Sequence, residues 1–247
     1  CRRMGAAPVV GIDVGGTKIL AVVIDPVDPA TILDTRTAPT GATADEVLDA
    51  LIELAVDLEA GDRLGIGLAG LVDAAGVLRA APNLGCMVDV PVASILADRL
   101  GIEPPVIDND ANCALRAELL MGAARGADDV VLVTLGTGIG GALALDGLVR
   151  RGAHGFAGEP GHVLVDPDGP RCPCGRVGCW ERYASGAGLA HLAAASGLGP
   201  LRGEEVVALA RGGDTFSSRL AWIDGLGELA KIYSVFGGNA ALGLPSV

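Results

Sequence analysis

The sequence predicts an α/β fold made of two related lobes, and three observations lead to that expectation. Short apolar runs bounded by glycine turns alternate with longer stretches of helical spacing. A displacement of 121 positions, the offset from Val9 to Val130, repeats a strand, a glycine turn and a second strand, and it places Gly15 on Gly136. A chain of 247 residues has room for one large domain or two ordinary ones.

The first half of the chain shows a regular succession of elements. Three strands are expected first, at Pro8–Asp13, Lys18–Asp25 and Thr31–Ala38. Thr43 and Glu46 have the spacing of a capping box, which starts a helix that Gly61 ends. The later elements are expected as strands at 64–69 and 105–108 and as helices at 92–100 and 111–122.

The two lobes are expected to meet near residue 122. We assign residues 1–122 to an N-terminal α/β lobe and residues 123–247 to a C-terminal α/β lobe. Two related lobes that face each other would place the two glycine turns on opposite walls of one cleft. Such a cleft is where the phosphates of a nucleotide would bind.

Composition and charge exclude several classes of protein. A formal net charge of −12 argues against a basic face for DNA or RNA, and two Trp, two Tyr and three Phe offer few platforms for stacked bases. The longest uncharged stretches, such as 130–145, are shorter than the ~20 apolar residues that span a bilayer. We therefore expect no nucleic-acid partner and no membrane span.

The N-terminus and the cysteines bear on location. No signal peptide is expected, and Cys1 is interpreted as a clipped or misassigned start, with Met4 as the candidate initiator and a lipidated mature end as the alternative. The cluster of Cys172, Cys174 and Cys179 indicates metal chemistry in a reducing compartment rather than a disulfide scaffold. The expected location is the cytoplasm.

Two glycine-rich turns carry groups that bind phosphate. Glycines let the backbone approach a phosphate closely, and hydroxyl and amide groups of the turn donate hydrogen bonds. An apolar strand rather than a helix follows each turn, so neither is a P-loop or a dinucleotide fingerprint, and ordinary hairpin turns are the alternative. Asp13 is placed to hold Mg²⁺ or its waters. The nucleotide-binding candidates are Asp13, Gly15, Gly16, Thr17 and Lys18 in the first turn and Gly136, Thr137 and Gly138 in the second.

Carboxylates and amides gather in the segment VIDNDAN at 106–112. A kinase needs one carboxylate to orient an alcohol and accept its proton, and an Asp at the carboxyl end of a strand in an α/β sheet points into the ligand crevice. Asp110 is therefore the candidate base. The alternative is that Asp110 only caps the helix that follows.

The most specific motif is His162 followed by Cys172, Cys174 and Cys179. Three sulfurs and one imidazole form a closed tetrahedral zinc site, and the glycines and prolines between the cysteines permit the tight turns that such a site needs. Zinc on one ring nitrogen of His162 would leave the other as a fixed donor to a ligand. Free buried thiols are the alternative.

Two acidic residues flank this motif. Glu159 precedes His162 by three residues in a stretch too rich in Gly and Pro for a helix, and Glu181 follows the last cysteine by two. Two carboxylates and one imidazole, held by zinc, form a clamp for vicinal hydroxyls. Solvated acidic loop residues are the alternative reading.

Together these motifs resemble the ROK family (repressor, open reading frame, kinase) of sugar kinases, and within it the bacterial ATP-dependent glucokinases. The resemblance runs from about Val9 to Gly188. It rests, in this order, on DVGGTK, APN at 81–83, NDAN at 109–112, LGTGIGG, GEPGH, CPCGRVGC and ERYASG. These motifs are specific for the family and far less specific for the sugar.

The resemblance implies an actin-like ATPase (ribonuclease H-like) fold with ATP and Mg²⁺ in a cleft between two lobes, and a structural Zn²⁺. It implies that Asp110 acts on the 6-hydroxyl of a hexose, with glucose as the expected substrate and glucose 6-phosphate as the product. The hydroxyl-binding residues that it implies are Gly70, Asn83, Asn109, Glu159, His162 and Glu181.

The C-terminal part departs from the family pattern. Members continue through further helices and a glycine-rich loop that contacts adenosine, whereas this chain stops at Val247 and offers only Gly237 and Gly238 for that loop. The C-terminal part of the fold is therefore expected to be truncated.

Several alternatives stay open at this point. N-acetylglucosamine, mannose or fructose could replace glucose, and polyphosphate could replace ATP. A sugar-binding remnant without catalysis is a further alternative. A repressor is disfavoured, because the family's repressors carry a winged-helix domain ahead of the first strand and only eight residues precede Val9. Kinases of this kind are commonly dimers, so a homodimer or higher homo-oligomer is expected.

Overall fold

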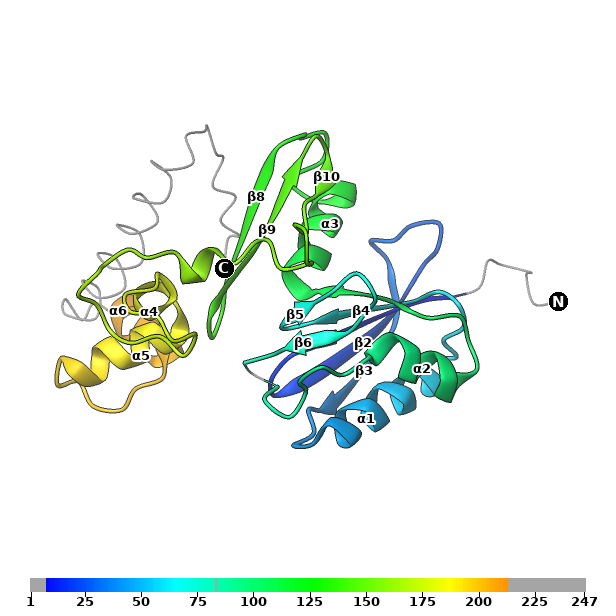
Figure 1. Cartoon of the computed structure of the whole chain (residues 1–247), viewed down its shortest axis with the longest axis horizontal. Helices are drawn as coiled ribbons and strands as arrows, with labels where there is room; N and C mark the ends of the chain where they lie inside the picture. Colours follow the sequence, from blue (N-terminus) through cyan, green and yellow to red (C-terminus); the bar gives the residue numbers. More distant parts are fainter. Residues whose placement is uncertain (1–7, 83, 213–247) are drawn as a thin grey trace. The chain divides into compact units, whose positions relative to one another are not determined.

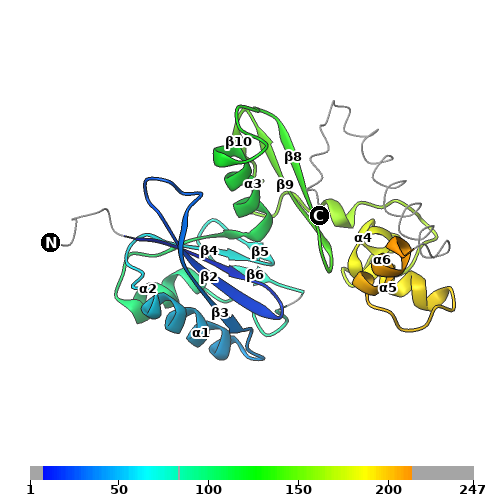
Figure 2. The ribbon, with the colours of Figure 1, turned by 180° about the vertical axis from the view of Figure 1, so that it is seen from behind.

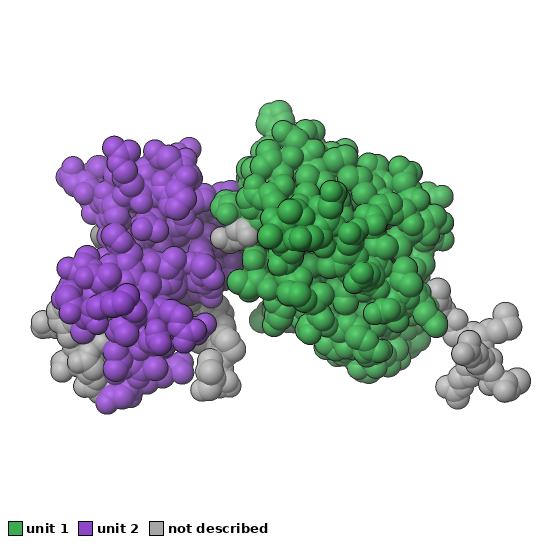
Figure 3. All heavy atoms as spheres, turned by 90° about the horizontal axis from the view of Figure 1, so that it is seen from below, with its two compact units in different colours: residues 1–130, 143–157 green, residues 131–142, 158–247 purple. Residues whose placement is uncertain are grey.

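The computed structural model describes residues 8–82 and 84–212 (Figure 1). The chain divides into two compact units, which Figure 3 colours separately. The first unit comprises residues 1–130 and 143–157, and the second comprises residues 131–142 and 158–247. The lobe boundary expected between residues 122 and 123 stays a prediction.

A five-stranded sheet forms the centre of the first unit, in the order β3-β2-β1-β4-β7. Strands β1, β2 and β3 pair antiparallel, while β1, β4 and β7 run parallel. The strands span Val9–Val14 (β1), Lys18–Ile24 (β2), Ile32–Pro39 (β3), Leu64–Leu68 (β4) and Val106–Asn109 (β7). The strands predicted from the sequence are confirmed, with ends that differ by no more than one residue.

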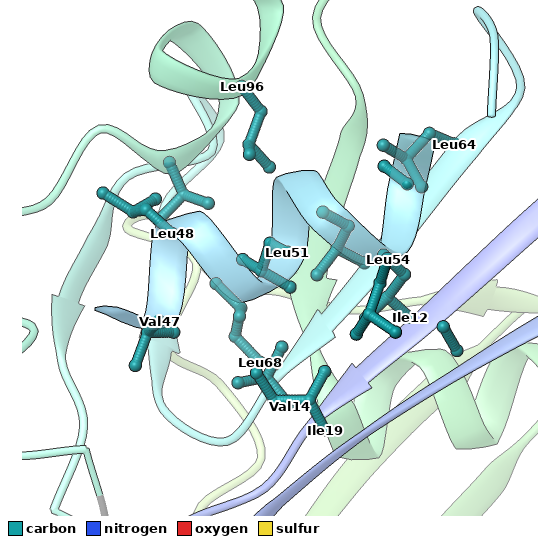
Figure 4. Close-up of a cluster of buried hydrophobic side chains, with 14 of the residues drawn as sticks. Ile12, Val14, Ile19, Val47, Leu48, Leu51, Leu54, Leu64, Leu68 and Leu96 are labelled. Atoms are coloured by element: carbon teal, nitrogen blue, oxygen red, sulfur yellow. The ribbon is translucent and has the colours of Figure 1, made fainter. Parts of the chain in front are cut away.

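Alternation along the strands decides which side chains face the core. In β1, Val10, Ile12 and Val14 are buried, whereas Asp13 between them is exposed. The buried set packs with helix α1 (Ala44–Asp57) in the hydrophobic cluster that Figure 4 shows. Full burial of each aliphatic side chain contributes about 1.5–3 kcal/mol. The same alternation turns Asp13 to the opposite face of the sheet.

Helix α1 begins with the predicted capping box. The Thr43 hydroxyl accepts a hydrogen bond from the Glu46 N–H at 3.2 Å, and the Glu46 carboxylate accepts one from the Thr43 N–H at 3.1 Å. The helix ends at Asp57, before the expected Gly61. Glu59 has a φ of 52°, and this left-handed backbone does not continue a helix. The predicted end is therefore wrong by about one turn.

Shorter elements complete the first unit. Helix α2 spans Val92–Leu100, as predicted, and α3 spans Asp110–Met121, starting one residue earlier than predicted. A small two-stranded sheet pairs β5 (Leu71–Val72) with β6 (Leu78–Ala80). Figures 1 and 2 show α1 and α2 side by side, in agreement with their direct contact.

A second hairpin repeats the first. Strand β8 spans Val130–Leu135 and β9 spans Ile139–Leu145, and with β10 (Leu148–Val149) they form a three-stranded sheet in the order β10-β9-β8. The bounds of β8 and β9 are those of β1 and β2 moved by 121 positions. The predicted internal repeat is therefore confirmed for the two strands and their turn. Residues 153–160, which the same displacement pairs with β3, contain no strand.

Beyond residue 158 the second unit contains a cysteine-rich loop and short helices. A 3₁₀ turn covers Pro160–His162, and α4 (Glu181–Ala184) follows the last cysteine of the loop. Helices α5 (Gly186–Ala195) and α6 (Gly203–Arg211) come next. In the part of the chain that the structure describes, no helix combines the length and the apolar character needed to cross a bilayer.

Candidate active site and metal centre

Three parallel strands of the first unit bring acidic residues to one edge of the sheet. Asp13 of β1 is in register with Gly67 of β4, and Gly67 is in register with Asp108 of β7. Asp110 follows as the first residue of α3. The carboxyl ends of parallel strands and the N-termini of helices are where α/β proteins commonly bind ligands.

The absence of a side chain at Gly67 lets two carboxylates approach each other. A β-carbon at this position would lie 3.5 Å from Asp110 Cα, 3.8 Å from Asp13 Oδ1 and 3.5 Å from Cys113 Sγ. Asp13 and Asp110 therefore border the same small space over β4. The structure brings together the predicted base and the predicted Mg²⁺-binding residue of the first turn.

Both carboxyl groups have a raised pKa. Burial is the main cause for Asp110, and the negative charge of Asp13 adds to it, while a hydrogen bond from the Ala111 N–H opposes it. Surrounding protein also raises the pKa of Asp13, although part of this residue stays accessible, and Lys18 opposes that shift. A carboxyl with a raised pKa is a better proton acceptor for an alcohol than an ordinary aspartate.

Asn109, rather than Asp110, caps helix α3. Its Oδ1 accepts a hydrogen bond from the Asn112 N–H at 3.1 Å, and its Nδ2 donates to the Gly70 carbonyl at 3.1 Å. The interpretation of Asp110 as the cap is wrong by one residue, because Asn109 has the extended backbone that a cap requires. Two predicted sugar-binding residues, Asn109 and Gly70, are thus joined directly.

Sequence reasoning missed an ion pair next to this cap, between a buried carboxylate and a partly exposed guanidinium. Asp108 is 7% exposed, and Arg151, which follows β10, donates to both of its carboxylate oxygens. The motif around Asp108 was visible in the sequence, but its partner lies 43 residues further along the chain. Only the packing of the strands brings them together.

The first glycine turn is held by the residue that follows β3. The turn closes with a hydrogen bond from the Gly15 N–H to the Lys18 carbonyl at 3.0 Å. The Thr40 hydroxyl donates to the Gly15 carbonyl at 2.7 Å, and the Thr40 N–H donates to the Thr17 carbonyl at 3.2 Å. Gly16, Thr17 and Lys18 are exposed, so they are accessible to a phosphate.

The second glycine turn is held by the start of helix α5. It closes with a hydrogen bond from the Gly136 N–H to the Gly138 carbonyl at 3.0 Å. The Gly186 N–H donates to the Gly136 carbonyl at 2.8 Å, and the Ala187 N–H donates to the Thr137 carbonyl at 3.1 Å. Gly136 and Thr137 are exposed. Both turns that the sequence assigned to phosphate therefore present accessible residues.

The structure brings the four predicted metal ligands together. One ligand atom each of His162, Cys172, Cys174 and Cys179 lies within 4.8 Å of all the others. The distance from Cys172 Sγ to His162 Nδ1 is 3.6 Å, and the distance from Cys174 Sγ to Cys179 Sγ is also 3.6 Å. A tetrahedral zinc ion sets its sulfurs about 3.8 Å apart, whereas a disulfide holds them at about 2.0 Å. The cluster therefore fits a metal ion with sulfur and imidazole ligands.

Glycines shape the loop that presents these ligands. Gly178 has a φ of 63°, and a β-carbon there would lie only 1.6 Å from the Asp166 carbonyl oxygen. Gly175 has a φ of 91° and donates to the Cys172 carbonyl at 3.0 Å. Only glycine adopts both conformations without strain, which explains its use between the cysteines.

Glu181 lies between the metal ligands and the second glycine turn. Its Oε1 is 3.5 Å from His162 Nδ1 and accepts a hydrogen bond from Cys172 Sγ at 3.1 Å. Its Oε2 lies 3.1 Å from the place of a β-carbon at Gly138. The position expected for Glu181, next to the metal cluster, is therefore observed, and its sugar-binding role stays a prediction.

Glu159 and His162 line one cavity in the second unit. This cavity has a volume of about 400 Å³, and its other lining residues are Val163, Leu164, Cys174 and Arg176. Glu159 is exposed and directly precedes the 3₁₀ turn that carries His162. Of the remaining predicted residues, Asn83 lies outside the described residues, as do Gly237 and Gly238.

The protein is similar to solved structures of sugar kinases. It matches the ROK family glucokinase from Streptomyces griseus, solved in complex with glucose and AMPPNP, with a TM-score of 0.78 and 36% sequence identity. The match covers 93% of this chain and 80% of that one. The predicted actin-like ATPase fold is thereby confirmed.

Its sequence relatives include two kinds of sugar kinase. The glucokinase of Streptomyces coelicolor is 38% identical over 208 residues, and the N-acetylmannosamine kinase of Citrobacter koseri is 40% identical over 190 residues. These matches cover 82% and 75% of this chain, which spans 64% and 63% of the length of the two relatives. Residues 9–230 match the ROK family. The chain therefore belongs to the ROK family.

Proposed function

We propose that this protein is a hexose kinase that transfers a phosphoryl group from ATP to the 6-hydroxyl of glucose. Membership of the ROK family and similarity to two kinds of sugar kinase support transfer to a sugar. The observation that carries the proposal is the place of Asp110, at the start of α3 beside Asp13, with a raised pKa.

Asp110 is the proposed base. Its carboxylate orients the 6-hydroxyl and accepts the proton as the hydroxyl oxygen bonds to the γ-phosphorus of ATP, while the bond from that phosphorus to the bridging oxygen breaks and ADP leaves. The transition state of phosphoryl transfer is loose, so the proton leaves late and a carboxylate suffices. Most of the catalysis then comes from positioning and from neutralisation of charge.

The proposed sugar-binding residues occur in both units. In the first unit, Asn109 is fixed by its bond to Gly70, so its amide is oriented before any ligand arrives. In the second unit, His162 and Glu181 are oriented by the metal cluster, and Glu159 lines the same cavity as His162. Carboxylates accept hydrogen bonds from sugar hydroxyls, and a neutral imidazole donates one.

The two glycine turns are the proposed phosphate-binding elements. The accessible residues of the first turn include Thr17 and Lys18, which supply a hydroxyl and a positive charge. Asp13 supplies the oxygen ligand that Mg²⁺ prefers. When bound, Mg²⁺ would neutralise the negative charge of the transferred phosphoryl group.

Zinc is the metal proposed for the cluster of one histidine and three cysteines. The donor set and the spacing of its atoms suit a closed structural site. These residues would hold the loop 159–181 in place, and with it the ring of His162. Elemental analysis of purified protein tests this assignment, with one zinc per chain as the expected result.

A coupled assay with a panel of acceptors tests the proposed function. The purified protein is supplied with ATP or polyphosphate and with glucose, mannose, fructose, N-acetylglucosamine or N-acetylmannosamine. We expect glucose and ATP to give the highest kcat/KM. Folded protein that binds a sugar but phosphorylates none of them would identify a sugar-binding or regulatory member of the family instead.

N-acetylmannosamine is the second candidate substrate. The 40% identity to the Citrobacter koseri kinase favours it. A higher kcat/KM for N-acetylmannosamine than for glucose in the same panel would replace glucose in the proposal while leaving the reaction class intact.

A further inference from the structure

The start of helix α3 is held by a network of hydrogen bonds around the buried carboxylate of Asp108. Asp108 accepts a hydrogen bond from the Asn109 N–H at 3.0 Å and another from the Asn112 Nδ2 at 3.0 Å. The Arg151 Nε lies 3.2 Å and 3.1 Å from the two oxygens of the same carboxylate, and the Arg151 Nη2 donates to one of them. Asp108 is thus surrounded by donors from three residues.

This network encloses the backbone of Asp110. Asn109 and Asn112, on its two sides, are both bound to Asp108 and are also bound to each other through the cap of α3. Asn112 is 1% exposed, so its side chain cannot move without disturbing the core. The position of Asp110 is therefore set by a network in which Asp108 and Asn112 have no proposed contact with a ligand.

Arg151 is itself held in place. Its carbonyl accepts a hydrogen bond from the Ala157 N–H at 3.0 Å, which closes the loop 151–157. Gly155 of this loop has a φ of 90°, and a β-carbon there would lie 2.4 Å from the Val72 carbonyl oxygen, so the loop lies directly on β5. A planar guanidinium on a fixed loop binds a carboxylate with two parallel hydrogen bonds and defined geometry.

A buried carboxylate requires such a partner. The Asp108 side chain is 10% exposed and that of Arg151 is 36% exposed, so the carboxylate is the buried member of the pair. Removing Arg151 leaves this buried charge without its ionic partner and is destabilising, whereas replacing both members is less so. The pair therefore has a cost that an apolar contact would avoid. Asp108 precedes the proposed base by two residues, and this place gives a charged pair a use that an apolar contact would not have.

We propose that Asp108 and Arg151 are positioning residues that fix Asn109 and Asp110 for the reaction, without contact to the substrate. The inference rests on the proposed function for its kinetic consequence. Its structural part states that the pair keeps the residues at the start of α3 ordered, and this can be tested without any activity.

Three variants test the inference, with kinetics as the first measurement. Arg151→Gln removes the charged fork, Arg151→Lys keeps the charge without the fork, and the double variant Asp108→Asn with Arg151→Gln removes the buried charge together with its partner. We expect kcat with glucose to fall about 10- to 100-fold in Arg151→Gln and in the double variant, and less in Arg151→Lys. The KM for ATP should stay unchanged.

Arg79→Gln is the matched control. Arg79 also forms ion pairs within the first unit, with Asp73 and Asp89, and its side chain is 46% exposed, close to the 36% of Arg151, but it lies in β6 and its ion-pair partners lie outside the start of α3. Its loss should leave kcat unchanged. If Arg79→Gln lowers kcat as much as Arg151→Gln, a general loss of stability explains the effect and the inference is wrong.

Hydrogen exchange without any ligand is the second measurement. The Arg151→Gln and double variants should exchange faster in peptides that cover 106–113 and at the wild-type rate in peptides from α1.

If Arg151→Gln does not fold, the double variant answers the question, because it carries no unpaired buried charge. A folded double variant with wild-type kcat and wild-type exchange at 106–113 overturns the inference. If the wild type phosphorylates no sugar, the proposed function fails and the exchange rates alone decide the matter.

Discussion

The two glycine turns belong to one repeated hairpin, yet each is supported differently. The flanking strands have identical bounds after a displacement of 121 positions. The first turn is bound by Thr40, at the end of the neighbouring strand, and the second by the backbone of Gly186 and Ala187 at the start of α5. The first turn thus depends on the sheet and the second on the helices that follow the metal ligands.

Their chemistry differs as well. Asp13 and Lys18 of the first hairpin correspond to Thr134 and Ile139 of the second, so the charges are present in only one copy. The first hairpin brings a carboxylate to the space beside Asp110, whereas the second lies against Glu181 and the metal cluster. The repeated backbone therefore accompanies two kinds of candidate site, one at the carboxyl edge of the sheet, called the sheet-built site, and one at the proposed metal cluster, called the metal-built site.

Asp110→Asn should have the largest effect and should act only on the sheet-built site. We expect kcat to fall by about 10²- to 10⁴-fold, because the proton of the sugar hydroxyl loses its acceptor. Glucose binding, measured by calorimetry, should be spared. Asp98→Asn, at an exposed position of α2, is the control. Retention of most activity in Asp110→Asn would remove Asp110 from the mechanism.

Removal of the metal should have the next largest effect and should act only on the metal-built site. Chelation is expected to disorder the loop from Glu159 to Glu181 and to weaken sugar affinity before ATP affinity, because the loop carries proposed sugar ligands. Hydrogen exchange of this loop and the two dissociation constants check this. Cys174→Ser should reproduce the effect, and Cys86→Ser, at an exposed cysteine outside the cluster, should not. An unchanged sugar Kd in folded, metal-free protein would count against it.

Two single substitutions should loosen one turn each. Ser185 caps α5 by accepting a hydrogen bond from the Gly188 N–H at 3.0 Å. Ser185→Ala should lower the free energy of unfolding by about 1 kcal/mol and speed amide hydrogen exchange at 136–138.

Thr40→Val removes the hydroxyl bound to Gly15. It should lower the free energy of unfolding by about 0.5–1.5 kcal/mol and speed amide hydrogen exchange at 15–17. If either variant loosens both turns equally, the two supports are not independent.

The smallest effect should be a gain of stability. Because burial and Asp13 raise the pKa of Asp110, the folded state holds this proton more tightly than the unfolded chain does. Above the raised pKa the ionised group therefore costs stability, and below the unfolded value of about 3.9 the cost is gone. Asp110→Asn should raise Tm at pH 7, and this gain should shrink as the pH falls through that window. A lower Tm at pH 7 would contradict the raised pKa.

The sequence predicted local features well. The capping box of α1, the strands of both hairpins and the grouping of the four predicted metal ligands follow from short-range patterns, in which turn residues and spacing suffice. The start of α3 was misplaced by one residue because Asn109 and Asp110 are both good capping residues, and only the backbone distinguishes them.

The contacts that position the site could not be predicted. Arg151 meets Asp108, Thr40 meets Gly15 and Gly186 meets Gly136 across long stretches of chain. Each of these contacts depends on how strands and helices pack, which a pattern in one segment does not encode. The sequence therefore indicated the candidate functional groups and did not indicate the contacts that hold them in place.

Trp180 gives the metal-built site an optical signal of its own. In the sequence it lies between Cys179 and Glu181. Its side chain is fully buried, and among the described residues its indole N–H has no hydrogen-bond partner. An indole in such dry surroundings emits at short wavelength, and loss of the metal would shift its emission to the red. Cobalt in place of zinc would quench it by energy transfer, so in a Trp222→Phe background, which removes the second tryptophan, the occupancy of the cluster could be followed by fluorescence.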